Sequence, residues 1–335
     1  NARKRVASLL GISSNEVFFT SGATESNNIA LQGLKEYAEK TGKKHIITTS
    51  IEHKSILETA KYMELNGYEV DFIDPNKSGQ ISIEEVLEKL REDTLLVSIM
   101  HVNNETGVIQ PVLELGEEIQ KRGILFHIDA TQSCGKLVEE IRNLKYDMLS
   151  FSAHKLMGPQ GVGALILKRK LYKRPPIKGI MYGGQQEQGI RPGTIPVALV
   201  VGCGKACEIA EHEYKENERH SLQIKEAILF VLEESGLKYQ INGNQDVCVS
   251  STLNIAIDGV SSEALMISSK QYCGISNGSA CTSSNYSPSY VLAAMGLDGS
   301  RIEASLRLSW GPNSDLKEVV DNFKKLLYVA KLMAN

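Results

Sequence analysis

The chain has 335 residues, of which 42% are hydrophobic and 23% are charged, and its formal net charge at pH 7 is -3. Because Lys and Arg (37 together) are fewer than Asp and Glu (40) and no long basic run occurs, we expect no direct nucleic-acid binding. The longest apolar runs fall far short of the about 20 residues that span a bilayer, and no signal peptide opens the chain, so we expect a cytoplasmic protein without a membrane segment.

The six cysteines are sparse and form no C-x-x-C pair, which favours neither a disulfide framework nor a zinc site. Cys203 and Cys207 lie one helical turn apart and are most simply small core residues. His127 could share a strand face with Asp129, but the sequence offers no third ligand, so we expect no metal site. Residues 2–11 have the pattern of a helix ending at a glycine, and we expect that an N-terminal segment is missing.

From residue 16 to residue 167, short apolar runs alternate with segments of helical period. Runs of this type are strands buried on both faces, as in parallel sheets covered by helices. They span residues 16–21, 45–50, 68–74, 94–100, 123–129, 146–152 and 161–167. Helical spacing occurs at 25–42, 83–93 and 113–123. We expect an α/β fold with a mostly parallel seven-stranded sheet.

The remaining part of the chain has a different pattern. After a Pro- and Gly-rich passage at 174–196, one long helical pattern runs from about 197 to 235. Apolar runs at 251–259 and 304–311 and a helical pattern at 314–333 follow. Because 335 residues exceed the usual size of one hydrophobic core, we expect a large domain over 1–212 and a smaller α+β domain over 213–335.

Polar segments follow five of the predicted strands. In open α/β sheets, ligands bind beyond the carboxyl ends of the strands. The five segments are SGATES (21–26), IEHKS (51–55), HVNNE (101–105), DATQS (129–133) and SAHKLMG (152–158). We expect them to line one polar pocket.

Three features of this pocket have a functional and a plain structural interpretation. Gly22 and Thr24 open a helix that can bind an anion such as phosphate, and a plain capping role for Ser21 or Thr24 explains this segment equally well. Asp129 follows a buried strand and needs a cation, which a pyridinium nitrogen or an Arg or Lys side chain supplies. Lys155 is either a nucleophilic amine or a solvated lysine. In combination, the three indicate pyridoxal phosphate.

Seven motifs occur in order over nearly the whole chain: TSGATESNN (20–28), EHKS (52–55), HVNNETG (101–107), HIDATQSCGK (127–136), SFSAHKLMGPQGVGAL (150–165), RPGT (191–194) and SNGSACTS (276–283). Their joint occurrence resembles the cysteine desulfurases of the NifS/IscS type, which are fold-type I pyridoxal-phosphate enzymes of the class V aminotransferase group. Residues 276–296 are similar to the DndA-like branch, which serves DNA phosphorothioation.

The resemblance implies a role for each matching residue. Lys155 would bind pyridoxal phosphate as a Schiff base, Asp129 would pair with the pyridinium nitrogen, and Gln132 would hydrogen-bond the phenolic oxygen. His53 would stack on the ring and move protons, and Asn104 would bind near the substrate carboxylate and the ring oxygen. The residues that match the phosphate-binding positions are Ala23, Thr24, Ser152 and His154.

The resemblance also implies a substrate and partners. Arg307 would bind the α-carboxylate of L-cysteine, although the residue alone is as well explained as an exposed strand arginine. Thr194 would reach the phosphate of a neighbouring subunit in a homodimer. As a thiolate, Cys281 would attack the substrate sulfur, leaving alanine and a persulfide. A sulfur-acceptor protein for iron–sulfur assembly, tRNA thiolation or DNA phosphorothioation would then take the sulfur.

One segment departs from the family, since GGQQEQG at 183–189 stands where GGGHERG is usual, so the resemblance implies no contacts for Gln186 and Gln188. Two other functions agree less well with the sequence. A selenocysteine lyase or aminotransferase has no need of Cys281, and a non-catalytic sulfur carrier or scaffold has no need of Lys155, Asp129 and Arg307.

Overall fold

The computed structural model describes residues 1–278 and 288–334. It divides into two compact units. The first consists of Asn1–Ile73, Ile81–Val102 and Gln110–Tyr214, and the second of Asp74–Gln80, Asn103–Ile109 and Lys215–Asn335. The domain limits expected from the sequence, 1–212 and 213–335, stay a prediction beside this division.

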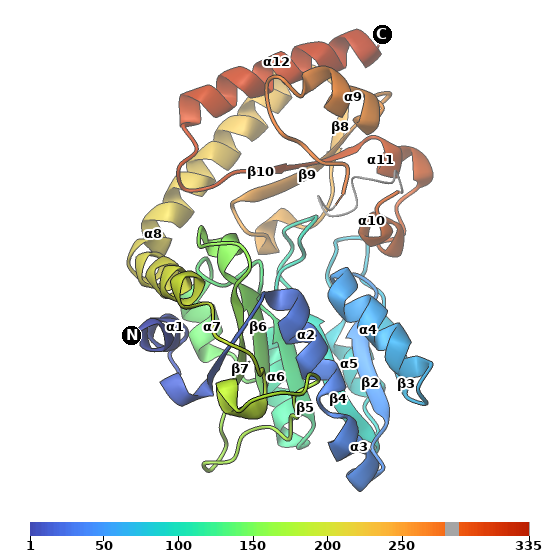
Figure 1. Cartoon of the computed structure of the whole chain (residues 1–335). Helices are drawn as coiled ribbons and strands as arrows, with labels where there is room; N and C mark the ends of the chain where they lie inside the picture. Colours follow the sequence, from blue (N-terminus) through green and yellow to red (C-terminus); the bar gives the residue numbers. More distant parts are fainter. Residues whose placement is uncertain (279–287, 335) are drawn as a thin grey trace. The chain divides into compact units, whose positions relative to one another are not determined.

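A seven-stranded sheet forms the centre of the first unit (Figure 1). Its strand order is β1-β7-β6-β5-β4-β2-β3, with parallel pairing from β3 through to β6 and antiparallel pairing on both sides of β7. The strands are β1 (Val17–Thr20), β2 (His45–Thr49), β3 (Glu69–Ile73), β4 (Thr94–Met100), β5 (Leu125–Asp129), β6 (Met148–Ser152) and β7 (Gly163–Leu167). The predicted α/β fold with a mostly parallel seven-stranded sheet is confirmed.

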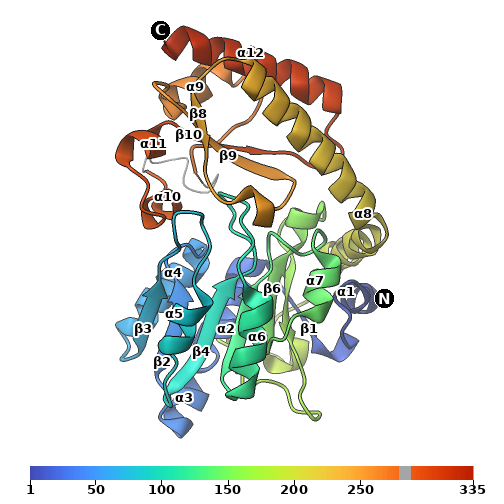
Figure 2. The same cartoon turned by 180° about the vertical axis from the view of Figure 1, so that it is seen from behind.

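Helices cover both faces of this sheet, as the two opposite views show (Figure 1, Figure 2). Consecutive strand residues point to opposite faces, so Phe18 and Ile46 belong to one apolar cluster and Phe19 and Ile47 to another. On the first face lie α2 (Ala23–Gln32), α3 (Lys35–Thr41) and α4 (Lys54–Glu64). On the second lie α1 (Ala2–Leu10), α5 (Ile83–Glu88), α6 (Val112–Lys121) and α7 (Val138–Asn143).

Two predicted elements differ from the observed ones. The helix predicted over 25–42 is broken into α2 and α3 at Gly33, whose carbonyl accepts a hydrogen bond from the backbone N–H of Lys178 (2.9 Å). A Cβ at Gly33 would lie 2.6 Å from the Lys178 carbonyl oxygen, so the close approach of residue 178 requires glycine there. The run at 68–74 predicts a strand buried on both faces. It forms β3, which lies at the edge of the sheet, and Glu69 at its start is exposed.

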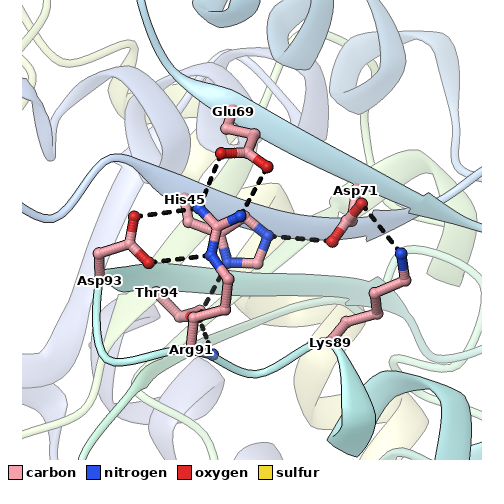
Figure 3. Close-up of polar contacts among 7 residues, drawn as sticks. All are labelled: His45, Glu69, Asp71, Lys89, Arg91, Asp93 and Thr94. Carbon is pink, nitrogen blue, oxygen red and sulfur yellow. Dashed lines mark hydrogen bonds and ion pairs between the residues drawn. The ribbon is translucent and has the colours of Figure 1, made fainter.

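A polar network joins the amino ends of β2, β3 and β4 (Figure 3). His45 is fully buried and contacts the Thr94 hydroxyl through Nδ1 (2.9 Å) and the Asp71 carboxylate through Nε2 (3.2 Å). Arg91 forms ion pairs with Glu69 (2.5 Å) and Asp93 (2.9 Å). These contacts fix the register of the three strands at the end opposite to their carboxyl ends.

The second unit has an antiparallel three-stranded sheet of order β10-β9-β8, formed by β8 (Tyr239–Ile241), β9 (Thr252–Ile257) and β10 (Ser305–Ser309). Its core is built from the sheet and the apolar faces of three helices. These are α8 (Val197–Glu234), which begins in the first unit, α9 (Ser262–Ser269) and α12 (Leu316–Ala334). Two short helices complete it, α10 (Tyr290–Ala294) and α11 (Gly299–Glu303). Within the described part of the chain, no helix is long and apolar enough to cross a membrane.

Candidate active site

The carboxyl ends of β5 and β6 bring four of the predicted residues to one edge of the sheet. Asp129 is the last residue of β5, and its Cα faces Ser150 in the parallel neighbour β6. Ser152 ends β6, and His154 and Lys155 follow in a 3₁₀ turn, Ala153–Leu156. The predicted acid and the predicted lysine therefore lie at the ends of adjacent strands, Asp129 on β5 and Lys155 in the turn after β6.

The start of α2 is attached to the end of β6. The backbone N–H of Ala23 donates to Ser152 Oγ (2.7 Å), so these two predicted phosphate-binding residues contact each other. A Cβ at Gly163 on β7 would lie 2.8 Å from Gly22 Cα, which shows how closely β7 approaches the turn before α2. Thr24, in the first turn of this ten-residue helix, is exposed. The helix end and the hydroxyl groups fit a phosphate.

Asp129 is 5% exposed, and its carboxylate accepts two hydrogen bonds. Oδ1 accepts from the backbone N–H of Thr131 (2.9 Å) and Oδ2 from Asn27 Nδ2 (2.8 Å). None of the ion pairs formed by residues 1–278 and 288–334 involves Asp129, so an Arg or Lys partner is excluded there. A buried carboxylate held only by neutral donors suits a cationic ring nitrogen.

Lys155 and His154 are both exposed at the end of β6. Partial burial, together with the positive charge of Lys155, lowers the pKa of His154. Met157 adopts a left-handed backbone conformation (φ 63°) and ends the turn that presents the lysine.

His53 caps α4. Its Nδ1 accepts from the backbone N–H of Ser55 (3.1 Å) and lies 2.8 Å from Ser55 Oγ. The side chain is half-buried and lines a pocket of the first unit together with Thr24. Gln132 is also half-buried, three residues after the end of β5.

Thr194 is exposed, five residues after segment 183–189, which departs from the family pattern. Two contacts hold residues 183–194: Gln186 Oε1 accepts from the Gly193 N–H (3.1 Å), and Arg191 forms an ion pair with Glu25 (3.0 Å). Gln188 lies 3.5 Å from Arg174. The glutamine in place of the usual histidine thus has a structural role in the loop that carries Thr194.

Asn104 and Arg307 belong to the second unit. A guanidinium nitrogen of Arg307, on β10, donates to the Asn104 carbonyl oxygen (3.0 Å). Within residues 1–278 and 288–334, the buried Oδ1 of Asn104 has no hydrogen-bond partner. A ligand that donates a hydrogen bond to this amide oxygen would satisfy it.

Cys281 lies outside the described residues, but the positions on both sides of its segment are defined. Ser289 Oγ donates to Glu105 Oε2 (2.5 Å), and a Cβ at Gly278 would lie 3.6 Å from the same oxygen. Ser276 Oγ donates to the Gly278 carbonyl oxygen (2.8 Å). Glu105, which is 1% exposed, therefore contacts one end of the segment and lies beside the other.

Sequence reasoning missed three buried polar residues of the first unit. Asn27 bonds to Asp129 and Ser55, Glu52 accepts from the Met100 N–H (2.8 Å), and Glu187 binds Arg3 (2.7 Å). The position of Asn27 four residues after Ala23 was an available signal, because this spacing directs both side chains to the same helix face. The other two contacts join distant parts of the chain and have no local signal.

His127 is fully buried between Ser98 Oγ (2.9 Å) and Ser150 Oγ (2.9 Å), and burial lowers its pKa to about 4. The described residues contain no cluster of three His, Cys, Asp or Glu side chains suited to a metal. His127 is a neutral part of the sheet core.

The chain resembles known families over almost its whole length. The aminotransferase class-V family matches residues 1–323. A protein of Vibrio vulnificus strain YJ016 described as cysteine desulfurase IscS is 42% identical over 318 residues, which cover 95% of this chain and 78% of that protein. The cysteine desulfurase IscS of Aeromonas salmonicida strain A449 has the same identity and coverage.

Solved structures give the same result. DndA from Streptomyces lividans is 42% identical with a TM-score of 0.83, covering 92% of this chain and 87% of DndA. A NifS-like protein is 35% identical with a TM-score of 0.89, covering 99% and 87%. SspA in complex with cysteine is 36% identical with a TM-score of 0.80, covering 94% and 86%.

Proposed function

The chain belongs to the class V aminotransferase family as a pyridoxal-phosphate-dependent cysteine desulfurase of the NifS/IscS type, and on this premise we propose how its residues divide the reaction. Lys155 binds the cofactor covalently, Asp129 pairs with its ring nitrogen, and Gln132 donates to its phenolic oxygen. The phosphate is bound by Ala23, Thr24, Ser152 and His154. The observation that carries this proposal is Asp129, a buried carboxylate with neutral donors on both oxygens and no ion pair within the described residues.

Bound pyridoxal phosphate supplies an electron sink for the α-carbon of the substrate. Arg307 and Asn104 would bind the carboxylate of L-cysteine. The amino group of L-cysteine would replace Lys155 Nζ in its bond to the cofactor, and the freed Nζ would then accept the α-proton. His53 would cover one face of the ring. Cys281 would act as a thiolate: its Sγ forms a bond to the substrate sulfur while the Cβ–S bond of the substrate breaks. The sulfur then stays on Cys281 as a persulfide, and the bonding electron pair stays with the carbon skeleton, which takes up a proton and leaves as alanine.

The active unit in this proposal is a homodimer. Thr194 is exposed at the tip of a segment that Gln186 and Arg191 hold in place, which suits a residue that reaches a neighbouring subunit. Thr194 of the partner subunit would complete the phosphate site. A cytoplasmic location stays a prediction from the sequence.

The persulfide then passes to an acceptor protein. The IscS relatives and the DndA structure are equally similar to the chain, at 42% identity. To identify the pathway, the enzyme carrying a radiosulfur-labelled persulfide is incubated separately with acceptor proteins of iron–sulfur assembly, tRNA thiolation and DNA phosphorothioation. The rate at which each acceptor gains label is measured, and the fastest transfer identifies the pathway. Equal and slow transfer to all three would contradict a dedicated acceptor from these pathways.

Variants test the assignment of residues. The purified protein should absorb visible light, lose this absorbance on borohydride treatment, and release alanine and sulfide from L-cysteine in the presence of a thiol. Lys155→Ala should lack the covalent cofactor, whereas Cys281→Ser should retain it and form no persulfide. Cys273→Ser, which alters a half-buried cysteine of the second unit, is the matched control and should behave as wild type. Full activity of Cys281→Ser on cysteine would refute the persulfide step.

A further inference from the structure

Four residues of the first unit form a continuous hydrogen-bonded chain. Asn27 Nδ2, on α2, donates to Asp129 Oδ2 (2.8 Å) and to Ser55 Oγ (2.9 Å). Ser55 Oγ lies 2.8 Å from His53 Nδ1. This hydrogen-bonded relay, formed by Asp129, Asn27, Ser55 and His53, links the predicted partner of the cofactor's ring nitrogen, Asp129, to the histidine predicted to cover that ring, His53.

The direction of each hydrogen bond follows from chemistry. Because an ionised Asp129 only accepts, the amide nitrogen of Asn27 must face it, and both hydrogens of that nitrogen are then used. In the opposite amide orientation, Oδ1 would meet the carboxylate oxygen. The observed orientation leaves Asn27 Oδ1 buried without a hydrogen-bond partner among the described residues.

His53 Nδ1 lies next to two groups. The backbone N–H of Ser55 is always a donor, and it points at Nδ1 from 3.1 Å. Nδ1 must therefore carry a lone pair. The 2.8 Å contact with Ser55 Oγ is then a bond that the hydroxyl donates, since the other neighbour of this oxygen, Asn27 Nδ2, has only hydrogens to offer.

We infer that Asn27 and Ser55 are positioning residues that hold the proton of neutral His53 on Nε2. The same two residues fix the orientation of the imidazole ring and the position of the Asp129 carboxylate. His53 then exchanges protons only through Nε2. The significance for turnover rests on the proposed function, in which His53 and Asp129 contact the same cofactor. The relay itself is built from side chains that are nearly inaccessible: Asn27 is 0%, Asp129 5% and Ser55 7% exposed.

Nitrogen-15 NMR of histidine-labelled protein tests the tautomer directly. The chain has seven histidines, and the signals of His53 are identified as those lost in His53→Gln. We expect an unprotonated Nδ1 and a protonated Nε2 in wild type and in Ser55→Thr, which keeps the hydroxyl. In Ser55→Ala the backbone N–H of residue 55 still points at Nδ1, so the tautomer should stay the same, but the Nδ1 signal should shift because it loses the hydrogen bond that the hydroxyl donates. A protonated Nδ1 in wild type, or an Nδ1 signal in Ser55→Ala at the wild-type position, would overturn the inference.

Cofactor release gives a second measurement. Ser55→Ala and Asn27→Ala should lose pyridoxal phosphate about tenfold faster than wild type, the lower end of what removing an outer-shell partner costs at metal sites. Thr59→Val is the matched control, because Thr59 Oγ1 bonds to the Ser55 carbonyl (2.8 Å) and not to the relay. Equal loss in all three variants would assign Asn27 and Ser55 to general packing.

The NMR result does not depend on turnover. A protein with the expected tautomer but no desulfurase activity would therefore refute the proposed function and leave the relay intact.

Discussion

Glu187 accepts hydrogen bonds from two guanidinium nitrogens of Arg3 (2.8 and 2.7 Å), a residue 184 positions earlier in the chain. The backbone N–H of Phe19 donates to the same carboxylate (2.8 Å). Glu187 therefore connects α1, the edge strand β1 and the segment that carries Thr194. Its backbone is left-handed (φ 48°), a conformation that a non-glycine residue adopts only where the surroundings impose it.

Replacing Glu187 by Ala should lower the free energy of unfolding by about 1–3 kcal/mol, because the buried Phe19 N–H loses its acceptor and Arg3 keeps only the Val17 carbonyl. Urea unfolding of the cofactor-loaded protein measures this. In Glu36→Ala the exposed pair between Glu36 and Lys40 is lost, and the urea midpoint should stay unchanged. Equal midpoints for the two variants would mean that the Arg3 contact adds nothing.

Because of Glu52, we expect the folded protein to lose stability toward alkaline pH. Complete burial raises the pKa of this carboxyl from 4.5 to about 8. Between these values the folded protein keeps a proton that the unfolded chain releases, so stability falls as pH rises, by at most about 1.4 kcal/mol per pH unit. In Glu52→Gln an amide oxygen remains to accept from Met100 and Thr49, and urea midpoints above pH 6.5 should lose this slope. A slope identical to wild type would contradict the assignment.

Because of His127, we expect the free energy of unfolding to fall as the pH is lowered, which is opposite to the effect of Glu52. Burial lowers the pKa of His127 from 6.5 to about 4, so the unfolded chain takes up the proton first and stability falls as pH decreases through this window. The two slopes oppose each other in wild type between about pH 4.5 and 6.5. The Glu52→Gln variant should therefore show a steeper acid limb than wild type in the same urea series.

Gly163→Ala should disturb the turn before α2. The added Cβ would lie 2.3 Å from the Phe151 carbonyl oxygen, which belongs to the paired strand β6, and 2.8 Å from Gly22 Cα in the turn before α2. We expect a loss of about 1–3 kcal/mol in unfolding free energy and weaker binding of pyridoxal phosphate. Gly299→Ala, where a Cβ meets nothing within 4 Å, is the control. Unaltered cofactor binding in Gly163→Ala would show that the turn tolerates the shift.

Asp129→Asn tests the charge at the ring nitrogen. The amide keeps the shape but removes the negative charge, so alanine formation should fall by about 10²–10³-fold, as for loss of one electrostatic group in other enzymes. Visible absorbance measures whether the cofactor is still bound. A variant that retains both cofactor and full activity would contradict the assigned role.

Local patterns were sufficient for the sheet and for the residues at its carboxyl ends, because strand burial and polar strand ends are encoded within a few neighbouring residues. They failed where distant segments meet. The break at Gly33 depends on residue 178, and the exposure of β3 depends on its place at the sheet edge. The segments at 74–80 and 103–109 belong to the second unit although they interrupt the first in sequence. For Asn27, the spacing from Ala23 indicated the helix face, but its partners Ser55 and Asp129, which lie 28 and 102 residues away, could not be read from the local pattern.

One buried carboxylate serves both described borders of residues 279–287. Ser276 Oγ donates to the Gly278 carbonyl oxygen, and Gly278 lies beside Glu105 Oε2, which also accepts from Ser289 Oγ. Because Glu105 is 1% exposed, water cannot replace it as the acceptor for Ser289. A change at Glu105 would therefore be felt at Gly278 and at Ser289 together, although these two residues are eleven positions apart in the sequence.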